Sequence, residues 1–122
     1  MNFLPGNVTS VEGNTAHIAV DGGDVPVTLS QNPPHVGDVV MVGIRPEHLS
    51  VGGAGAQITV RPDVTEQMGG VGYMHTYTKD DIHVVAEVKG RIAATATEAE
   101  QVALSFDPAD AFVFDASGAR LR

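Results

Sequence analysis

The sequence predicts an all-β fold of short antiparallel strands, arranged as a barrel or a sandwich. Two observations lead to this prediction. Apolar residues recur with a period of two far more often than with the helical period of 3.6, and Gly, Pro, Asn and Asp separate the apolar runs at short intervals. The predicted strands include Val8 and Val11 and residues 17–20, 25–29, 39–44, 58–60, 73–77, 82–88, 102–106 and 112–114.

Two hairpins follow from the turn residues. The first reverses at residues 21–24, where two glycines tolerate the positive φ that a tight antiparallel turn requires. The second is centred on Lys79 and pairs residues 73–77 with 81–85, which places His75 across from His83. The pair Gly69-Gly70, just ahead of this hairpin, predicts a bulge or a bend at a barrel corner.

Only residues 95–101, which are rich in Ala and Glu, are a candidate helix. The segment is too short to form a stable helix without tertiary support, so the prediction allows at most one short helix. Farther on, Phe106, Phe112 and Phe114 are three of the six aromatic residues of the chain. This concentration predicts C-terminal strands that close the barrel or cover its open edge.

Composition narrows the classes of function. The 122 residues correspond to one domain, and no run approaches the roughly 18 apolar residues that a membrane-spanning helix requires. The formal net charge of −8 opposes binding to nucleic acid or to an anionic membrane surface. The absence of cysteine excludes disulfides and thiol catalysis, and it fits a cytoplasmic setting.

The sequence predicts no catalytic, cofactor-binding or metal site. It lacks both the phosphate-binding loop that ends in Gly-Lys-Ser/Thr and the Gly-x-Ser-x-Gly nucleophile elbow. None of the five histidines forms an i, i+4 pair of the kind that binds zinc on a helix. The cross-strand pair of His75 and His83 is the one geometric candidate, and an exposed hairpin face is the favoured interpretation of it.

Two short segments contain residues of interest that have a structural and a functional interpretation. The first comprises Gly43, Ile44, Arg45, Pro46, Glu47, His48 and Leu49. Pro46 ends the preceding strand and starts a turn, and Arg45 and Glu47 point to an ion pair or a hydrogen-bonded brace of the loop. His48 fits either a partner contact or the same turn. The second segment comprises Phe106, Asp107 and Pro108, where Asp-Pro is favourable turn chemistry after a strand.

The order of these segments carries a family resemblance across the chain. It consists of Met1-Asn2-Phe3-Leu4-Pro5-Gly6, the Gly43 to Leu49 segment, Val64-Thr65-Glu66-Gln67-Met68-Gly69, Leu104-Ser105-Phe106-Asp107-Pro108, and Phe114-Asp115. It resembles the TOBE (transport-associated OB) domain, the C-terminal regulatory part of ATP-binding subunits of carbohydrate-type ABC importers. Maltose, trehalose and glycerol phosphate importers share this pattern. Phe112 and Val71 depart from it.

The resemblance implies OB-like (TOBE/MOP-like) small β-barrels and a regulatory domain over residues 1–122, expressed without its N-terminal ATPase domain. It implies a second copy of the chain, the ATPase domain and, indirectly, the permease subunits as partners, with a regulatory protein or small ligand as a further one. ATP and Mg²⁺ would bind in the ATPase domain, and the complex would lie at the cytoplasmic face of the membrane. By this resemblance Gly43 to Leu49, Phe106 to Pro108, Phe114 and Asp115 are structural or interface residues.

Two other classes of function stay open from the residues. A stand-alone OB module that binds a small ligand is one, since small barrels hold ligands at their mouths or interfaces. A nucleic-acid-binding OB fold is the other, and the net charge and the single pair Tyr73 and Tyr77 count against it.

Overall fold

The computed structural model describes residues 1–89 and 100–122. In these ranges the chain is all-β, with an OB-like curled sheet, as predicted. The strands are β1 (Asn2–Glu12), β2 (Thr15–Val20), β3 (Gly23–Thr28), β4 (Val39–Ile44), β5 (Ser50–Val51), β6 (Ala56–Met68), β7 (Val71–Tyr77), β8 (His83–Lys89), β9 (Val102–Phe106), β10 (Phe112–Phe114) and β11 (Arg120–Leu121). The 3-10 turns η1 (Pro46–His48) and η2 (Pro108–Asp110) follow β4 and β9.

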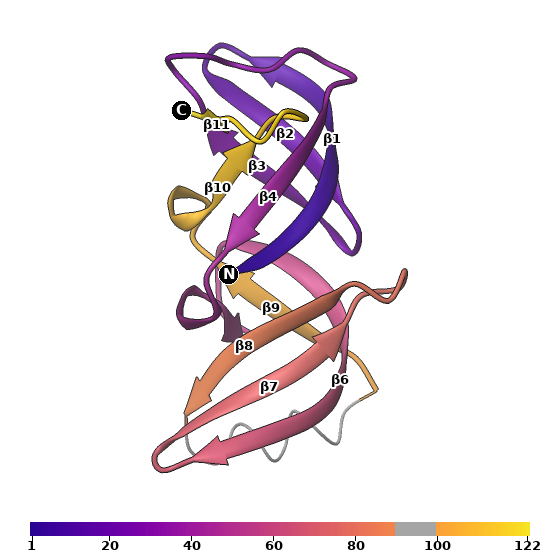
Figure 1. Cartoon of the computed structure of the whole chain (residues 1–122), viewed down its shortest axis with the longest axis vertical. Coiled ribbons are helices and arrows are strands. Elements are labelled where there is room, and N and C mark those ends of the chain that lie inside the picture. The colour runs from indigo at the N-terminus through magenta and orange to yellow at the C-terminus, as the bar shows by residue number, and fades with distance from the viewer. Residues whose placement is uncertain (90–99) are drawn as a thin grey trace.

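The sheet runs in the order β11-β10-β4-β1-β2-β3-β6-β7-β8, with β9 added to β6 and β5 added to β9. Figure 1 shows the resulting elongated shape. Strands β1 to β4, β10 and β11 form one end, and β6 to β9 form the other. The chain therefore crosses to the second end after β4 and returns to the first end with β10, which pairs with β4.

The core is one continuous apolar cluster that receives side chains from both ends. Strand β1 alternates strictly, so that Leu4 and Val8 are buried while Phe3 and Pro5 face outward. At the other end Met74 and Val84 are fully buried. No helix within residues 1–89 and 100–122 is long and apolar enough to cross a membrane.

Most predicted strands are confirmed, and two local predictions need correction. Gly69-Gly70 forms the two-residue turn between β6 and β7, since Met68 pairs with Val71. The bend comes earlier, as a bulge between Pro62 and Thr65. His75 pairs with Val85 and not with His83, because the β7–β8 loop is centred one residue later than expected. The candidate helix at residues 95–101 falls mainly on residues outside the described ranges.

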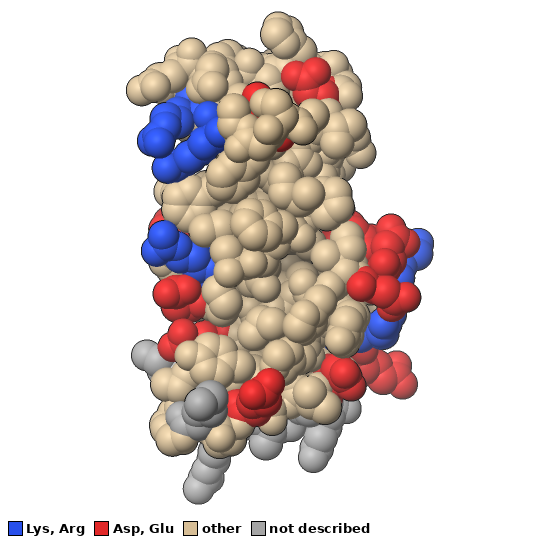
Figure 2. Space-filling view, in the orientation of Figure 1, with Lys and Arg blue, Asp and Glu red and all other residues tan. Residues whose placement is uncertain are grey.

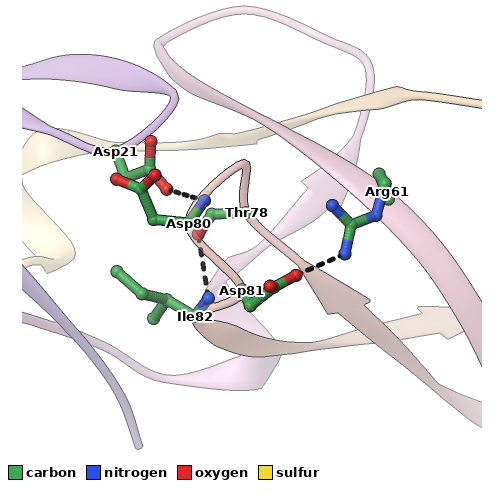
Figure 3. Close-up of polar contacts among 6 residues, drawn as sticks. All are labelled: Asp21, Arg61, Thr78, Asp80, Asp81 and Ile82. Carbon is green, nitrogen blue, oxygen red and sulfur yellow. Dashed lines mark hydrogen bonds and ion pairs between the residues drawn. The ribbon is translucent and has the colours of Figure 1, made fainter.

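Two turns meet where the two ends of the sheet join (Figure 3). The Asp21 carboxylate accepts a hydrogen bond from the backbone N–H of Asp80 at 2.7 Å, which ties the β2–β3 turn to the β7–β8 loop. Within that loop the Thr78 hydroxyl accepts from the N–H of Ile82, and Arg61 of β6 pairs with Asp81 at 2.7 Å. The hydrogen bond between Asp21 and Asp80 joins residues that are 59 positions apart in the sequence, so it links the two hairpins.

Asn2 makes a second joint between the ends. Asn2 is 7% exposed; its amide nitrogen donates to the carbonyl of Val85, and its amide oxygen accepts from the N–H of Val85, both at 2.8 Å. Within the described residues β8 is the last strand in the sheet order, so no further strand pairs with its outer edge there. The Asn2 amide satisfies one residue of that edge in the way a neighbouring strand would.

We expect Asn2→Ala to lower the free energy of unfolding by about 1–3 kcal/mol, because it leaves the N–H and carbonyl of Val85 without a partner. Urea unfolding measures the change, and hydrogen exchange at Val85 reports it locally. Asn7→Ala, on the exposed side of the same strand, is the control and should change little. Equal stability of the two variants would contradict this role for Asn2.

The joint at Asp21 predicts a dependence on pH. Hydrogen bonds from the Thr78 side chain and the Asp80 backbone lower the pKa of the Asp21 carboxyl below its ordinary value of 3.8. A lowered pKa stabilises the fold above pH 3.8, and the stabilisation is lost as the pH falls through the folded-state value. Because the group is exposed to solvent, we expect Asp21→Asn to cost less than about 1 kcal/mol at pH 7.

Urea midpoints of wild type and Asp21→Asn, taken from pH 7 downward, measure this difference. It should shrink toward zero under acid conditions well below pH 3.8. Asp63→Asn, at the exposed bulge of β6, controls for the removal of one carboxylate. A difference that stays constant with pH would show that Asp21 stabilises the joint without its charge.

Candidate functional site

The candidate site is an outward-facing apolar surface on β1, β4 and β10. It consists of Phe3, Met41, Phe112 and Phe114, which we call the aromatic face. The strand register brings them together: Phe3 and Phe112 both pair with Gly43, and Phe114 pairs with Met41. The rings of Phe3 and Phe114 are 6.1 Å apart and inclined by 58°, a geometry that aromatic pairs favour.

Gly43 lies beneath these rings. A Cβ atom at this position would lie 2.7 Å from the sulfur of Met1 and 3.4 Å from ring carbons of both Phe3 and Phe114. The absence of a side chain therefore lets these three residues close over the backbone of β4. Gly43 itself is buried in consequence.

Two arginines border the aromatic face. The guanidinium carbon of Arg120 is 4.5 Å from the centre of the Phe112 ring, and that of Arg45 is 5.5 Å from the same centre. Both distances are within the range of cation–π attraction. The predicted ion pair between Arg45 and Glu47 is not formed within the described residues, because the guanidinium of Arg45 is directed to the Phe112 ring.

The aromatic face is unusually exposed for its composition. Phe3 is 50% exposed, Met41 36% and the neighbouring Met1 49%. Figure 2 shows a broad surface without charged side chains in the middle of the view, with Lys and Arg at the left margin and the largest group of acidic side chains at the right. Contiguous exposed apolar surface of this kind usually marks an interaction site.

The remaining residues of the Gly43 to Leu49 segment hold the chain as it crosses between the ends of the sheet. Ile44 and Leu49 are core residues, 0% and 1% exposed, on either side of the η1 turn that Pro46 begins. Glu47 is exposed. The Nδ1 atom of His48 is buried and has no hydrogen-bond partner. A neutral imidazole with its proton on Nε2 fits this environment best, because it buries no unpaired N–H.

The second segment builds turns. Phe106 is 3% exposed and belongs to the core. The Asp107 carboxylate accepts from the N–H of Ala109, which caps η2, and Pro108 starts that turn. The Asp115 carboxylate accepts from the hydroxyl and N–H of Ser117 and from the N–H of Ala119, and these bonds lower its pKa. Asp115 therefore shapes the β10–β11 turn that positions Arg120.

The structure thus divides the residues that the sequence singled out. Gly43, Arg45 and Phe114 lie at the aromatic face, whereas Ile44, Leu49 and Phe106 are buried and Asp107, Pro108 and Asp115 form turns. Sequence reasoning did not identify Met1, Phe3, Met41 and Arg120 as members or neighbours of this surface. The sequence did contain a signal for this surface. Apolar residues of β1 occur on both faces of the strand, which indicates that both faces pack against other groups.

Comparison with known proteins agrees with this architecture. A family model for the MalK OB fold domain matches residues 1–49, and one for the TOBE domain matches residues 42–114. Neither describes a catalytic ATPase domain. The lactose transport ATP-binding protein LacK of Rhizobium radiobacter is 34% identical over 126 aligned residues, which cover 100% of this chain and 34% of LacK. The chain therefore spans about a third of the length of this relative.

Among solved structures, the cytoplasmic molybdate-binding protein ModG has a similar fold, with a TM-score of 0.73 and 10% sequence identity. The superposition covers 92% of this chain and 94% of ModG. At this identity the likeness concerns the fold alone. Because the TOBE domain match spans more than half of the 122 residues, this chain belongs to the TOBE domain family.

Proposed function

We propose that residues 1–122 form a single regulatory and self-association domain in the ATP-binding subunit of an ABC importer for a sugar or sugar phosphate. The match of this whole chain to a third of a relative named as a lactose transport ATP-binding protein supports this role. So does the lack of a phosphate-binding loop in the sequence, since a domain that regulates an ATPase need not bind nucleotide itself.

The aromatic face is the observation that carries the proposal. Protein interfaces are enriched in aromatic residues, Met and Arg, and depleted in Lys, Glu and Asp at their centres. The surface has this composition: three phenylalanines and Met41 lie at its centre, and Arg45 and Arg120 border it. A two-fold contact between two copies would bury the same rings on both partners.

The proposed role also implies which partners and ligands the complex has. A second copy of this chain and an ATPase domain would be direct partners, and the permease subunits indirect ones. ATP and Mg²⁺ would bind in the ATPase domain, and the complex would hold this domain at the cytoplasmic face of the membrane. A regulatory protein or a small ligand would act by favouring one arrangement of the paired domains. The net charge of −8 argues against a nucleic-acid partner.

A small-ligand module is the weaker alternative. A hollow of about 480 Å³ lies between the loop at residues 32–38 and the β10–β11 turn. The described residues that line it include Asp38 and Asp115 and no Lys or Arg, which disfavours an oxyanion. We therefore do not propose that this chain binds molybdate, the ligand named for ModG.

We expect sedimentation equilibrium of the purified chain to show a reversible dimer. The double variant Phe3→Ser/Met41→Ser should raise its dissociation constant at least about tenfold, because truncating central apolar contacts costs more than about 1.4 kcal/mol. Both side chains are substantially exposed, so the variant should keep its fold, which circular dichroism verifies.

Val64→Ser is the matched control, since Val64 is 55% exposed but lies on β6, outside the aromatic face. It should dimerise like wild type. A wild-type chain that stays monomeric at all concentrations, or a double variant that dimerises as well as the control, would overturn self-association through this surface.

A second experiment separates regulation from catalysis. We expect the purified chain to show no ATP hydrolysis, and Phe3→Ser/Met41→Ser in the full-length subunit to leave ATP affinity unchanged. The response of the ATPase to its regulators should be altered, because only the contact between regulatory domains is affected. Equilibrium binding of a fluorescent ATP analogue and steady-state turnover measure the two quantities. ATP turnover by the isolated chain would contradict the proposal.

A further inference from the structure

A second cluster of chemically distinctive side chains lies on the β6–β7–β8 sheet, apart from the aromatic face. It consists of Glu66, His75, Tyr77 and His83, which we call the histidine cluster. Tyr77 pairs directly with His83, and His75 pairs with Val85, so the two histidines are diagonal neighbours on one face of the sheet. His83 is exposed, and the side chain of His75 is 22% exposed.

The two imidazoles meet through their nitrogens. Nδ1 of His75 is 2.9 Å from Nε2 of His83, whereas the ring centres are 5.1 Å apart with planes inclined by 11°. A centre-to-centre distance so much longer than the N···N distance is possible only if both nitrogens lie between the rings. The rings therefore meet edge to edge, and the Tyr77 ring lies beside His83 at 5.1 Å.

Glu66 determines which nitrogen of His75 carries the proton. Its carboxylate oxygen is 2.6 Å from Nε2 of His75, so this nitrogen donates and the carboxylate accepts. The neutral His75 ring then presents a lone pair at Nδ1 toward His83. His83 completes the chain by donating its Nε2–H to that lone pair.

We propose that the histidine cluster binds one divalent transition-metal ion that prefers imidazole nitrogen, such as Zn²⁺, Ni²⁺ or Cu²⁺, through Nδ1 of His75 and Nε2 of His83. His83 gives up the proton on Nε2 and takes one from water on Nδ1, so both rings stay neutral and the net proton count is unchanged. The bonds formed are two metal–nitrogen bonds, and two metal-bound waters are displaced. No redox change is involved.

The geometry is close to what Zn²⁺ requires. Metal–nitrogen bonds of about 2.0–2.1 Å in a tetrahedral site place two nitrogens about 3.3–3.4 Å apart. The observed 2.9 Å therefore has to open by only about 0.4–0.5 Å, with a rotation of each ring that turns the lone pairs toward a common point. His83 is exposed, so core packing does not hold its ring.

Glu66 fits the supporting role that metal-binding histidines commonly have. Such a histidine usually donates its second ring N–H to a carboxylate, which fixes the tautomer and raises the basicity of the ligand nitrogen. Within residues 1–89 and 100–122 no three His, Asp or Glu side chains converge as direct ligands, so water would fill the other positions. The net charge of −8 favours the approach of a dication.

The competing interpretation is an ordinary cross-strand hydrogen bond on an exposed hairpin, which the sequence alone favours. Spacing in the sequence shows neither the convergence of Nδ1 and Nε2 nor the position of Glu66 behind His75. These two contacts separate the histidine cluster from the three histidines elsewhere in the chain. His35, for example, has a side chain that is 92% exposed and lies 3.9 Å from Asp38.

Isothermal titration of the full chain, free of any added histidine tag, with ZnCl₂ and with NiCl₂ tests the proposal. We expect one ion per chain, a loss of affinity of at least tenfold in His83→Ala and in His75→Ala, and a loss of about 10–100-fold in Glu66→Gln. His35→Ala should bind like wild type. Thermal melting without metal verifies that each variant is folded, and Glu66→Gln keeps both ligand rings in place.

Nitrogen-detected NMR of the imidazoles gives an independent measurement. Without metal, His75 should be the tautomer protonated at Nε2, and Zn²⁺ should shift Nδ1 of His75 and Nε2 of His83 together. Binding that is absent, that is reduced equally by His35→Ala, or that is unaffected by His83→Ala would overturn the site. Undiminished affinity in Glu66→Gln would overturn the supporting role of the carboxylate.

Discussion

Strand β6 is the element on which the rest of the structure depends, because it joins the two ends of the sheet: it pairs with β3 of the first end and with β7 and β9 of the second. Residues 56–60 pair with β9, and residues 61–68 pair with β7, with a bulge between Pro62 and Thr65 inside the second pairing. A slip of one residue would expose Ile58 and Val60, which are 0% and 2% exposed. The buried side chains thus fix the register of both ends at once.

The contacts to β6 also explain the glycine pair, Gly22 and Gly23, at the start of β3. A Cβ atom on Gly23 would lie 2.2 Å from the carbonyl oxygen of Gln57, and one on Gly22 would lie 2.7 Å from that of Thr59. Gly22 in addition has a φ of +93°, which favours glycine. Larger side chains would push β3 away from β6. Asn2 and Asp21 then complete the junction from either side.

The two candidate sites use different properties of this scaffold. The aromatic face forms where β10 returns to β4, so it depends on the chain crossing from one end of the sheet to the other and back. The histidine cluster lies on the local β6–β7–β8 meander and depends on the loop that sets the β7–β8 register. Changes at one site should therefore leave the other intact, which allows self-association and metal binding to be studied separately.

The sequence by itself determined the class of fold, most strand positions and the turns at Pro46, Asp107 and residues 21–24. These features are local, since the period of two and the conformational limits of Gly and Pro act within a few residues. It also carried the family resemblance through the order of short segments.

Only the tertiary structure decided which of these segments meet. Phe3, Gly43 and Phe112 come from three distant parts of the chain, and Asn2 binds Val85 across 83 positions. The same is true on a smaller scale of His75, whose partner Glu66 and diagonal neighbour His83 follow from strand register and not from spacing. Register and strand order are set by the burial of the whole core, a sum over many weak contacts that no short stretch of sequence contains.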